Sequence, residues 1–248
     1  MTDVLRELID MARFLGDEQR DLAILGEGNT SVRADTESFW VKASGTELAQ
    51  ADEGTFVRVL FQPILASLQR ETLSDGEVKR ILVAAAVAGT RPPSIETFLH
   101  AMCLQLDGVH FVGHTHPTAA VSLLSTPRSR EWFAGALFPD QIVVLGPAMA
   151  YVPYADPGLP LAHAVQDGLR QFLAREHRVP RVVLLENHGV IALGGTAREV
   201  LNITRMLVKV CRILAGTIAA GGPRFLPSKN VERIDKRPDE LARRADFR

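Results

Sequence analysis

The stretch RVVLLENHGVIAL at residues 181–193 contains two short apolar runs that flank a polar turn. Runs of this length, rich in β-branched residues and bounded by turn residues, are typical of buried strands. The spacing of apolar residues predicts helices on either side of this pair, over residues 158–177 and 196–220. The second helix begins with a capping box, Thr196-Ala-Arg-Glu199, and Gly221-Gly222-Pro223 closes it. Strands and helices therefore alternate here, which indicates an α/β protein.

The same reasoning assigns elements to the rest of the chain. The segment 25–33 reads as a loop that runs into a strand, because it is rich in Gly, Asn, Thr and Ser before Val32. Helices are predicted over residues 5–15, 78–88 and 94–106, and strands over residues 38–43, 55–60, 109–116, 141–145 and 150–152. Helices and strands are interspersed without an internal repeat. Propensity alone favours an α/β sandwich and leaves open whether its sheet is parallel.

Size and composition are those of one globular unit. The chain has 248 residues, of which 46% are hydrophobic, and this suits a single domain with a sizeable buried core. Since no Pro/Gly/Ser-rich linker divides the middle of the sequence, we expect one domain over residues 1–224. Residues 225–248 form a charged C-terminal tail that is poor in apolar residues, and it is either a docked arm or partly disordered.

Charge and cysteine content narrow the range of partners and compartments. The formal net charge of −1 gives no reason to expect nucleic acid or an anionic membrane as a partner, although single basic residues can still bind a small anion. Two cysteines outside any CxxC pair fit a reducing cytoplasm better than a disulfide framework. Asp3, Glu7 and Asp10 exclude a signal peptide at the N-terminus, and apolar runs such as 81–88 are too short to cross a bilayer.

Three histidines form the strongest candidate for a site. His114 and His116 are two apart on a predicted strand and therefore share one face, where both imidazoles can converge on one ion. A His-x-His pair on a strand can also be two partly exposed histidines. His188 lies in the turn Glu-Asn-His-Gly, which can project it inward, and Gly189 permits a close backbone approach. Three histidines and one open position are the ligand count of a catalytic zinc site.

Glu96 is the candidate acid/base. It follows a Pro-Pro-Ser break and is expected in the first turn of the helix over residues 94–106. Acidic residues also favour helix N-termini through the dipole alone, so the catalytic interpretation requires that Glu96 face the metal. His100 lies four residues further on the same helical face, where it either orients Glu96 or simply packs in the core.

Two small-residue loops have the character of anion-binding loops. They are Gly26-Glu27-Gly28-Asn29-Thr30-Ser31 and Ala43-Ser44-Gly45-Thr46, with Lys42 beside the second. Glycines allow backbone N–H groups to approach a phosphate, and hydroxyl and amide groups add further donors. Either loop can equally be an ordinary turn. The other histidines, His110, His163 and His177, are expected to be structural or exposed.

The order of these segments resembles the class II aldolase/adducin family. The resemblance covers residues 26–194, most of the chain, and no single motif in it is decisive. Its six stretches are GEGNTSVR (26–33), VKASGTEL (41–48), PSIETFLHA (93–101), GHTHPTAAVSLL (113–124), YVPYADPG (151–158) and ENHGVIALG (186–194).

The resemblance implies a three-layer α/β/α sandwich around a mixed, mostly antiparallel sheet, and homotetramers with active sites at subunit interfaces. It implies a zinc-type ion, Zn²⁺ or another divalent metal such as Mn²⁺ or Co²⁺, on His114, His116 and His188. Glu96 matches the family's catalytic glutamate. The family's phosphate-binding positions match Asn29, Thr30, Ser44, Gly45 and Ser94.

Two departures from the family pattern affect the site. Many family aldolases have a second serine where this chain has Ile95, so one phosphate donor is missing. Some use a tyrosine from a neighbouring subunit, after the HxH segment, as a proton donor. Here that region offers Trp132 and Phe133, and the first tyrosine is Tyr151, so the proton donor is left open.

The reaction implied is reversible aldol cleavage of a ketose phosphate through a metal-stabilised enediolate, in which Glu96 moves the proton at the nucleophilic carbon. Decarboxylation or epimerisation of a sugar phosphate on the same fold is the nearest alternative. A non-catalytic interaction module, like the adducin head, is the alternative of another class. The presence of all three histidines and Glu96 argues against that module.

Overall fold

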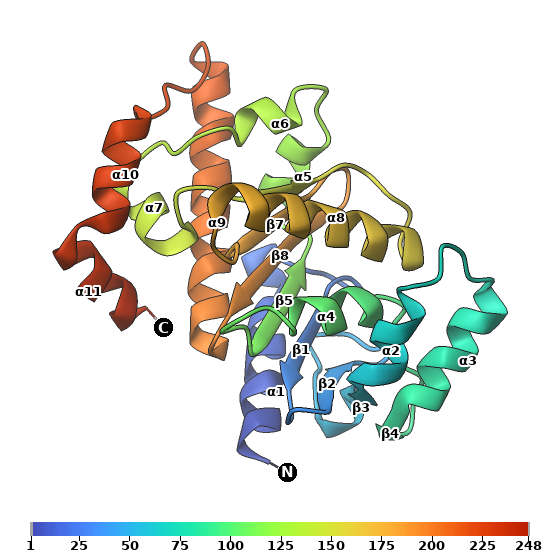
Figure 1. Cartoon of the computed structure of the whole chain (residues 1–248). Coiled ribbons are helices and arrows are strands. Elements are labelled where there is room, and N and C mark those ends of the chain that lie inside the picture. Colours follow the sequence, from blue (N-terminus) through green and yellow to red (C-terminus); the bar gives the residue numbers. More distant parts are fainter. Residues whose placement is uncertain (1, 248) are drawn as a thin grey trace.

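The computed structural model describes residues 2–247 and contains an eight-stranded sheet in the order β4-β3-β2-β1-β5-β8-β7-β6 (Figure 1). The strands are β1 (Asn29–Arg33), β2 (Ser38–Lys42), β3 (Phe56–Leu60), β4 (Ala86–Ala88), β5 (Phe111–Thr115), β6 (Ala150–Val152), β7 (Val182–Leu185) and β8 (Gly189–Gly194). Neighbouring strands pair antiparallel, except for β6 and β7, which pair parallel. The expected mixed, mostly antiparallel sheet is therefore confirmed.

Helices cover both faces of the sheet, so the three-layer prediction is also confirmed (Figure 1). One face carries α2 (Phe61–Ser67), α3 (Asp75–Ala85), α4 (Thr97–Cys103) and α8 (Leu159–Glu176). The other face carries α1 (Asp3–Leu15), α5 (Thr118–Leu124), α7 (Pro139–Leu145) and α9 (Ala197–Ala219), with the short α6 (Ser129–Trp132) beside α5. Alternate strand residues enter opposite cores: Val112 of β5 packs on the α4 side and Phe111 on the α9 side.

The segment 141–145, expected to be a strand, is the helix α7, so that prediction is wrong. Every residue from Gln141 to Leu145 is buried, because α9 packs on one side of α7 and α10 (Ser228–Lys236) on the other. A helix that is buried all round loses its amphipathic period, and a short apolar run then cannot be told from a strand. Pro139 at the start of α7 is the local sign of a helix that the prediction did not use.

Two other boundaries differ from the prediction. The helix expected to reach residue 88 stops at Ala85, and Ala86–Ala88 form the edge strand β4 against β3. The helix expected over residues 94–106 is only the seven-residue α4, so Glu96 is its N-cap and does not lie within the first turn. Tertiary pairing overrides helix propensity in the first case, since alanine suits a helix better than a strand.

Over residues 225–247, the described part of the charged tail, the chain forms a docked arm. It folds into α10 and α11 (Pro238–Asp246), which lie beside α7 in Figure 1. Ile234 joins a small apolar cluster with Ile142 and Val143. The neighbouring Asp235 is buried and accepts hydrogen bonds from Arg178 and Arg244, each at 2.8 Å. The buried Ile234 and the paired carboxylate of Asp235 thus hold this segment against the domain. Its composition alone does not decide between an ordered and a disordered segment.

Both cysteines, Cys103 and Cys211, are buried free thiols, and burial raises the pKa of each to about 12. Within residues 2–247, no helix is both long enough and apolar enough to cross a bilayer.

Candidate metal centre

The structure brings His114, His116 and His188 together. His114 lies on β5, His116 just beyond its end, and His188 in the turn between β7 and β8. The Nε2 atoms of His114 and His116 are 3.0 Å apart, and one ligand nitrogen from each histidine lies within 4.8 Å of the others. Two zinc–nitrogen bonds of ~2.0–2.1 Å at a tetrahedral angle place their nitrogens roughly 3.3 Å apart. The spacing therefore suits three ligands of one divalent ion.

The hydrogen bonds of the rings leave the correct atoms free for a metal. The Nδ1 of His114 is 3.0 Å from the carbonyl oxygen of Val190. Because a carbonyl can only accept, Nδ1 donates a proton to it, and Nε2, which faces Glu96 and His116, is the atom of this ring that would bind an ion. The Nδ1 of His116 lies 3.8 Å from a carboxylate oxygen of Glu27, too far for a hydrogen bond, while its Nε2 faces His114. The donor set therefore fits the zinc-type ion that was expected.

Local backbone chemistry shapes the turn that carries His188. Asn187 has a φ of 52°, in the left-handed region that asparagine tolerates better than most residues. Gly189 packs so closely that a Cβ there would lie 2.6 Å from both His116 Cδ2 and the carbonyl oxygen of Thr115. A glycine is therefore required at position 189 for the two strand ends to approach and for His116 to keep its rotamer.

We expect that Gly189→Ala destabilises the fold by about 1–3 kcal/mol, as overpacking of a dense interior does, and weakens zinc binding by displacing His116. Urea unfolding of the metal-free protein and zinc titration measure the two effects. Gly216→Ala is the matched control, since Gly216 sits within α9 and its added Cβ would meet no described atom within 4 Å outside its chain neighbours and the surrounding helix backbone. The free energy of unfolding of Gly216→Ala should rise by up to ~1 kcal/mol. Unchanged zinc affinity in Gly189→Ala would contradict the steric argument.

Glu96 faces this group. Its Oε1 lies 3.2 Å from His114 Nε2 and 3.6 Å from His188 Nε2, and its side chain is only 14% exposed. Its backbone N–H donates to the Ser94 hydroxyl at 3.3 Å. A helix-terminal acid that served only the dipole would point to solvent, whereas this carboxylate points into the histidine cluster. The condition set by the catalytic interpretation of Glu96 is therefore met.

Charge states follow from burial and from these contacts. Burial lowers the pKa of His116 to about 3 and that of His188 to about 4, so both rings are neutral at pH 7, as metal ligands must be. Burial raises the pKa of Glu96, but the nearby His114 outweighs it and holds that pKa below its ordinary value. Burial lowers the pKa of His114, yet Glu96 outweighs this effect and raises it. Glu96 is therefore a carboxylate at neutral pH.

Three of the expected phosphate-binding residues lie on adjacent segments. Ala43 and Pro93 form an isolated antiparallel bridge, with Ser44 N donating to Pro92 O and Ser94 N donating to Lys42 O. These bonds hold the segment of Ser44 and Gly45 next to Ser94, and Ser94 lies two residues before Glu96. Lys42 is buried, and its Nζ donates to the carbonyl oxygens of Gly26 and Thr46 at 2.9 and 2.8 Å. It ties the two small-residue loops together.

Thr30 is not brought to this group. It pairs across the sheet with Gly113, and a Cβ at Gly113 would meet Val200 and Leu15 on the α1/α9 side. Asn29, one residue earlier, points to the opposite side, where it contacts Glu96. The Thr30 hydroxyl is buried and has no hydrogen-bond partner among the described residues. The strand alternation therefore removes Thr30 from the candidate phosphate site.

A cavity opens beside two of the three histidines. It is lined by His116, His188, Glu27 and residues of the 21–24 loop and of α5. Sequence reasoning missed Glu27 as a neighbour of His116, because the loop that contains it was interpreted only as an anion-binding loop. The one available signal was an acidic side chain between two glycines.

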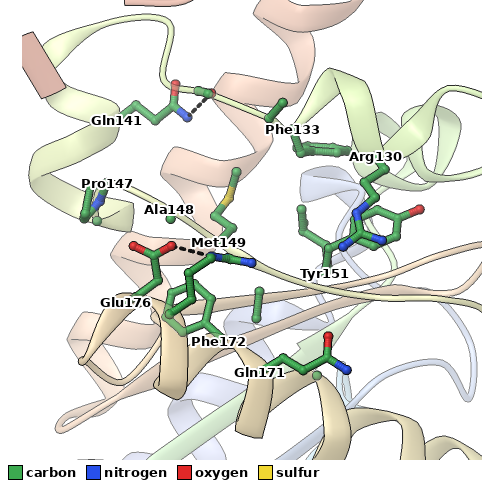
Figure 2. Close-up of a pocket in the computed structure, with 17 residues that line it drawn as sticks. Arg130, Phe133, Gln141, Pro147, Ala148, Met149, Tyr151, Gln171, Phe172 and Glu176 are labelled. Carbon is green, nitrogen blue, oxygen red and sulfur yellow. Dashed lines mark hydrogen bonds and ion pairs between the residues drawn. The ribbon is translucent and has the colours of Figure 1, made fainter. Parts of the chain in front are cut away.

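A separate cavity lies at the sheet edge formed by β6 (Figure 2). Its walls include Arg130, Tyr151 and Phe172, with the Arg130 guanidinium 5.5 Å from the centroid of the Tyr151 ring. Neither the three histidines nor Glu96 lines it.

A mixed sheet between two helical layers, with three imidazoles converging at strand ends, defines an α/β protein with a candidate divalent-metal site. The chain belongs to the class II aldolase/adducin family: the family model described as Class II Aldolase and Adducin N-terminal domain matches residues 6–215.

Individual relatives agree with this assignment. A class II aldolase domain from Thermoplasma acidophilum is 28% identical, with a TM-score of 0.67 over 86% of this chain and 94% of its own. A solved L-fuculose 1-phosphate aldolase is 22% identical, with a TM-score of 0.71 over 95% and 96%, and shows a shared fold. The protein named uncharacterized oxidoreductase YuxG, from Bacillus subtilis (strain 168), is 29% identical over 78% of this chain. The matched region covers only 27% of the length of YuxG.

Proposed function

We propose that this chain is a metal-dependent lyase that catalyses the reversible aldol cleavage of a ketose phosphate. One observation carries the proposal: a carboxylate, Glu96, lies 3.2 Å from a nitrogen of a buried three-histidine cluster. An interaction module has no need of buried imidazoles and a buried carboxylate, which are costly to desolvate. Perturbed, converging titratable groups of this kind are typical of catalytic sites.

His114, His116 and His188 would hold one ion of the zinc type, and Zn²⁺, Mn²⁺ and Co²⁺ are the candidates. A bound divalent ion supplies Lewis acidity to substrate oxygens on which negative charge develops. Glu96, as a carboxylate, takes the proton from the nucleophilic carbon of the ketone fragment in the condensation direction. In the cleavage direction the same group returns the proton to that carbon.

The phosphate of the substrate would lie at the segments that carry Ser44, Gly45 and Ser94. Two hydroxyl groups and the N–H groups of a glycine-containing turn are suitable donors for an anion. The φ of Gly45 is +71°, a conformation that turns successive N–H groups towards one side. Ile95 follows Ser94 and has no hydrogen-bond donor in its side chain. The site would therefore have one hydroxyl donor fewer than the family pattern with two serines.

The printed name of one solved relative supports the same class of chemistry, whereas YuxG is named as an oxidoreductase. One solved relative is an aldolase of a sugar phosphate, L-fuculose 1-phosphate, and its likeness extends over 95% of this chain. Decarboxylation or epimerisation of a sugar phosphate would use the same ion and carboxylate. A homotetramer in the cytoplasm with sites at subunit interfaces is the assembly that we propose from the family resemblance.

The experiment is a screen of ketose phosphates with zinc-loaded protein, in which the products are identified. We expect an aldehyde and a shorter ketone phosphate, competitive inhibition by inorganic phosphate, and little turnover of the unphosphorylated sugars. Thr30→Val should leave phosphate inhibition unchanged, because its hydroxyl faces the α1/α9 layer. Equal turnover of a sugar and its phosphate would show that the serine-containing segments do not bind phosphate. Carbon dioxide or an epimer as product would replace aldol cleavage by one of the alternatives.

A further inference from the structure

The cavity beside His116 and His188 offers a ligand mainly hydrogen-bond acceptors. Its volume is about 330 Å³, which is in the range of small-molecule sites. The Thr118 hydroxyl donates to Asp21 Oδ1 at 2.7 Å, and the Ser122 hydroxyl donates to the Thr118 carbonyl oxygen at 2.6 Å. Because both hydroxyl hydrogens are used within the protein, these two side chains keep only oxygen lone pairs for a ligand.

Two carboxylates make the same wall negative. Asp21 and Glu27 both line the cavity, whereas no lysine or arginine lines it among the described residues. Glu27 Oε1 lies 3.8 Å from His116 Nδ1, so one of the two charges lies directly beside the histidine cluster. Within residues 2–247, neither carboxylate forms an ion pair with a lysine or an arginine. Their negative charge is therefore not neutralised by the protein.

The loop that carries both acids is held in place by hydrogen bonds. The Leu22 carbonyl oxygen accepts from the backbone N–H of His116 at 2.8 Å, which joins the loop to the end of β5. Glu27 N–H donates to the Ile24 carbonyl oxygen at 3.0 Å, and Ile24 N–H donates to Glu27 Oε2 at 3.2 Å. The bond from α5 fixes Asp21. The wall is thus formed before a ligand binds, and its charges are preorganised.

The segments proposed to bind phosphate lie outside this cavity. One residue before Glu27, the Gly26 carbonyl oxygen accepts from the Lys42 ammonium group at 2.9 Å, whereas the Glu27 side chain lines the cavity. Neither Glu96 nor the serines of the phosphate segments line it. A substrate that extends from those segments past Glu96 to the histidines therefore places its remaining carbons in the cavity. In aldol chemistry these are the carbons of the aldehyde fragment.

We propose that this cavity holds the aldehyde fragment, and that Asp21 and Glu27 select the aldehyde by its charge. Hydroxyl or ammonium groups of an aldehyde can donate to this wall, whereas a carboxylate or phosphate meets acceptors and like charge. The inference rests on the proposed function and narrows its substrates to ketose phosphates with no second anionic group. Condensation forms one C–C bond, and the proton that Glu96 takes from the nucleophilic carbon is balanced by the proton that the aldehyde oxygen gains.

The first experiment compares three aldehydes of nearly equal shape. Each is condensed with dihydroxyacetone phosphate, the shortest ketone phosphate that has a hydroxyl beside its carbonyl group. The aldehydes are glyceraldehyde, tartronate semialdehyde, which ends in a carboxylate, and 3-amino-2-hydroxypropanal, which ends in an ammonium group. For the zinc-loaded wild type, kcat/KM should be roughly 25–100-fold lower for tartronate semialdehyde than for glyceraldehyde, since each like charge about 4 Å away in water costs roughly 5–10-fold. The amino aldehyde should react at least as well as glyceraldehyde.

Variants test whether the two acids cause this discrimination. Asp21→Asn and Glu27→Gln keep the shapes of the side chains, so each should reduce the discrimination by roughly 5–10-fold, and the double variant should abolish it. The discrimination is a ratio within one protein, so differences in metal content cancel. The single variants are decisive if the double variant does not fold.

Glu18→Gln is the matched control. This acid is exposed, lies three residues before Asp21 and does not line the cavity, so its variant should keep the wild-type ratio. A wild type that uses glyceraldehyde and tartronate semialdehyde equally, or variants of Asp21 and Glu27 that discriminate as the wild type does, would overturn the proposal.

The second experiment needs no turnover. Hydroxamates bind divalent ions through two oxygens, so propionohydroxamate, succinate monohydroxamate and 3-aminopropionohydroxamate would bring a neutral, an anionic and a cationic tail to the cavity. Their Kd values follow from the thermal stabilisation of the zinc-loaded protein. We expect the anionic compound to bind the wild type most weakly, and the double variant to bind all three alike. Equal Kd values for the wild type would overturn the proposal.

The proposed function and this inference fail in distinguishable ways. If no ketose phosphate is cleaved but hydroxamate binding depends on Asp21 and Glu27, the aldol reaction is wrong and the charge selectivity of the cavity stands. If ketose phosphates are cleaved but aldehydes and hydroxamates of every charge are treated alike, the reaction stands and the role given to the two acids is wrong.

Discussion

Glu96→Gln should reduce deuterium uptake into the ketone fragment by roughly 10²–10⁴-fold, the usual contribution of a positioned acid/base group. The substitution keeps the shape of the side chain and its contact with Asn29, and removes only the group that accepts a proton. The ion should remain bound, because His114, His116 and His188 are unchanged. Substrate affinity should change much less than uptake, since the phosphate segments are also unchanged.

The measurement is uptake from heavy water per bound complex, with the metal content of each preparation determined. Glu27→Gln is an informative comparison: this carboxylate lies 3.8 Å from His116 and is 41% exposed, so its loss changes the local charge without touching the Glu96 position. It should retain most of the wild-type uptake. If Glu96→Gln took up deuterium as fast as the wild type, another residue would move the proton, and Glu96 would be only a helix N-terminal acid.

His188→Ala should abolish tight binding of the divalent ion. Loss of a direct ligand should weaken affinity by more than the ~10–100-fold that loss of an outer hydrogen-bond partner costs. The fold should persist, because His188 sits in the turn between β7 and β8, with 12% of its side chain exposed. His114→Ala should also lose the ion, with a larger fall in stability, since it leaves a space in the interior and removes the bond to Val190.

Elemental analysis of protein purified without chelator measures the ion directly, and one ion per chain is expected. Thermal unfolding provides a second readout: zinc at 100 times its Kd stabilises the wild type by ~2.7 kcal/mol and should not stabilise His188→Ala. His110→Ala is the matched control, because this histidine precedes β5, is exposed and lies outside the cluster. A wild-type protein that binds no zinc, cobalt or manganese would refute the catalytic proposal.

The cavity at β6 in Figure 2 is lined by two arginines, Arg130 and Arg175, and by aromatic side chains. Arg175 forms an ion pair with Glu176 at 2.7 Å. This cavity shares no residue with the cavity beside the histidines. Phe172 also packs in the hydrophobic cluster that contains Phe98 and Leu99 of α4, the helix that Glu96 precedes, so Phe172→Leu tests packing that this cavity shares with the metal centre. A change in proton exchange from such a variant would indicate a coupling between this edge and the metal centre.

The sequence by itself determined most of the elements and the identity of the candidate ligands. Strand alternation placed His114 and His116 on one face, and the turn ENHG marked His188, because both patterns depend only on near neighbours in the chain. The three-layer fold came from the resemblance of six motifs. Apolar spacing failed where burial is complete, and α7 was taken for a strand for that reason.

Only the tertiary structure decided which of the polar residues act together. Asn29 and Glu96 are 67 residues apart in the chain, and their contact exists because β1 lies beside β5 while α4 packs above them. The same strand turns Thr30 to the opposite layer, so two adjacent residues of one motif have different surroundings. Local spacing fixes the face on which a side chain lies, but the order of strands in the sheet fixes what that face meets. That order depends on long-range pairing, which no short stretch of sequence encodes.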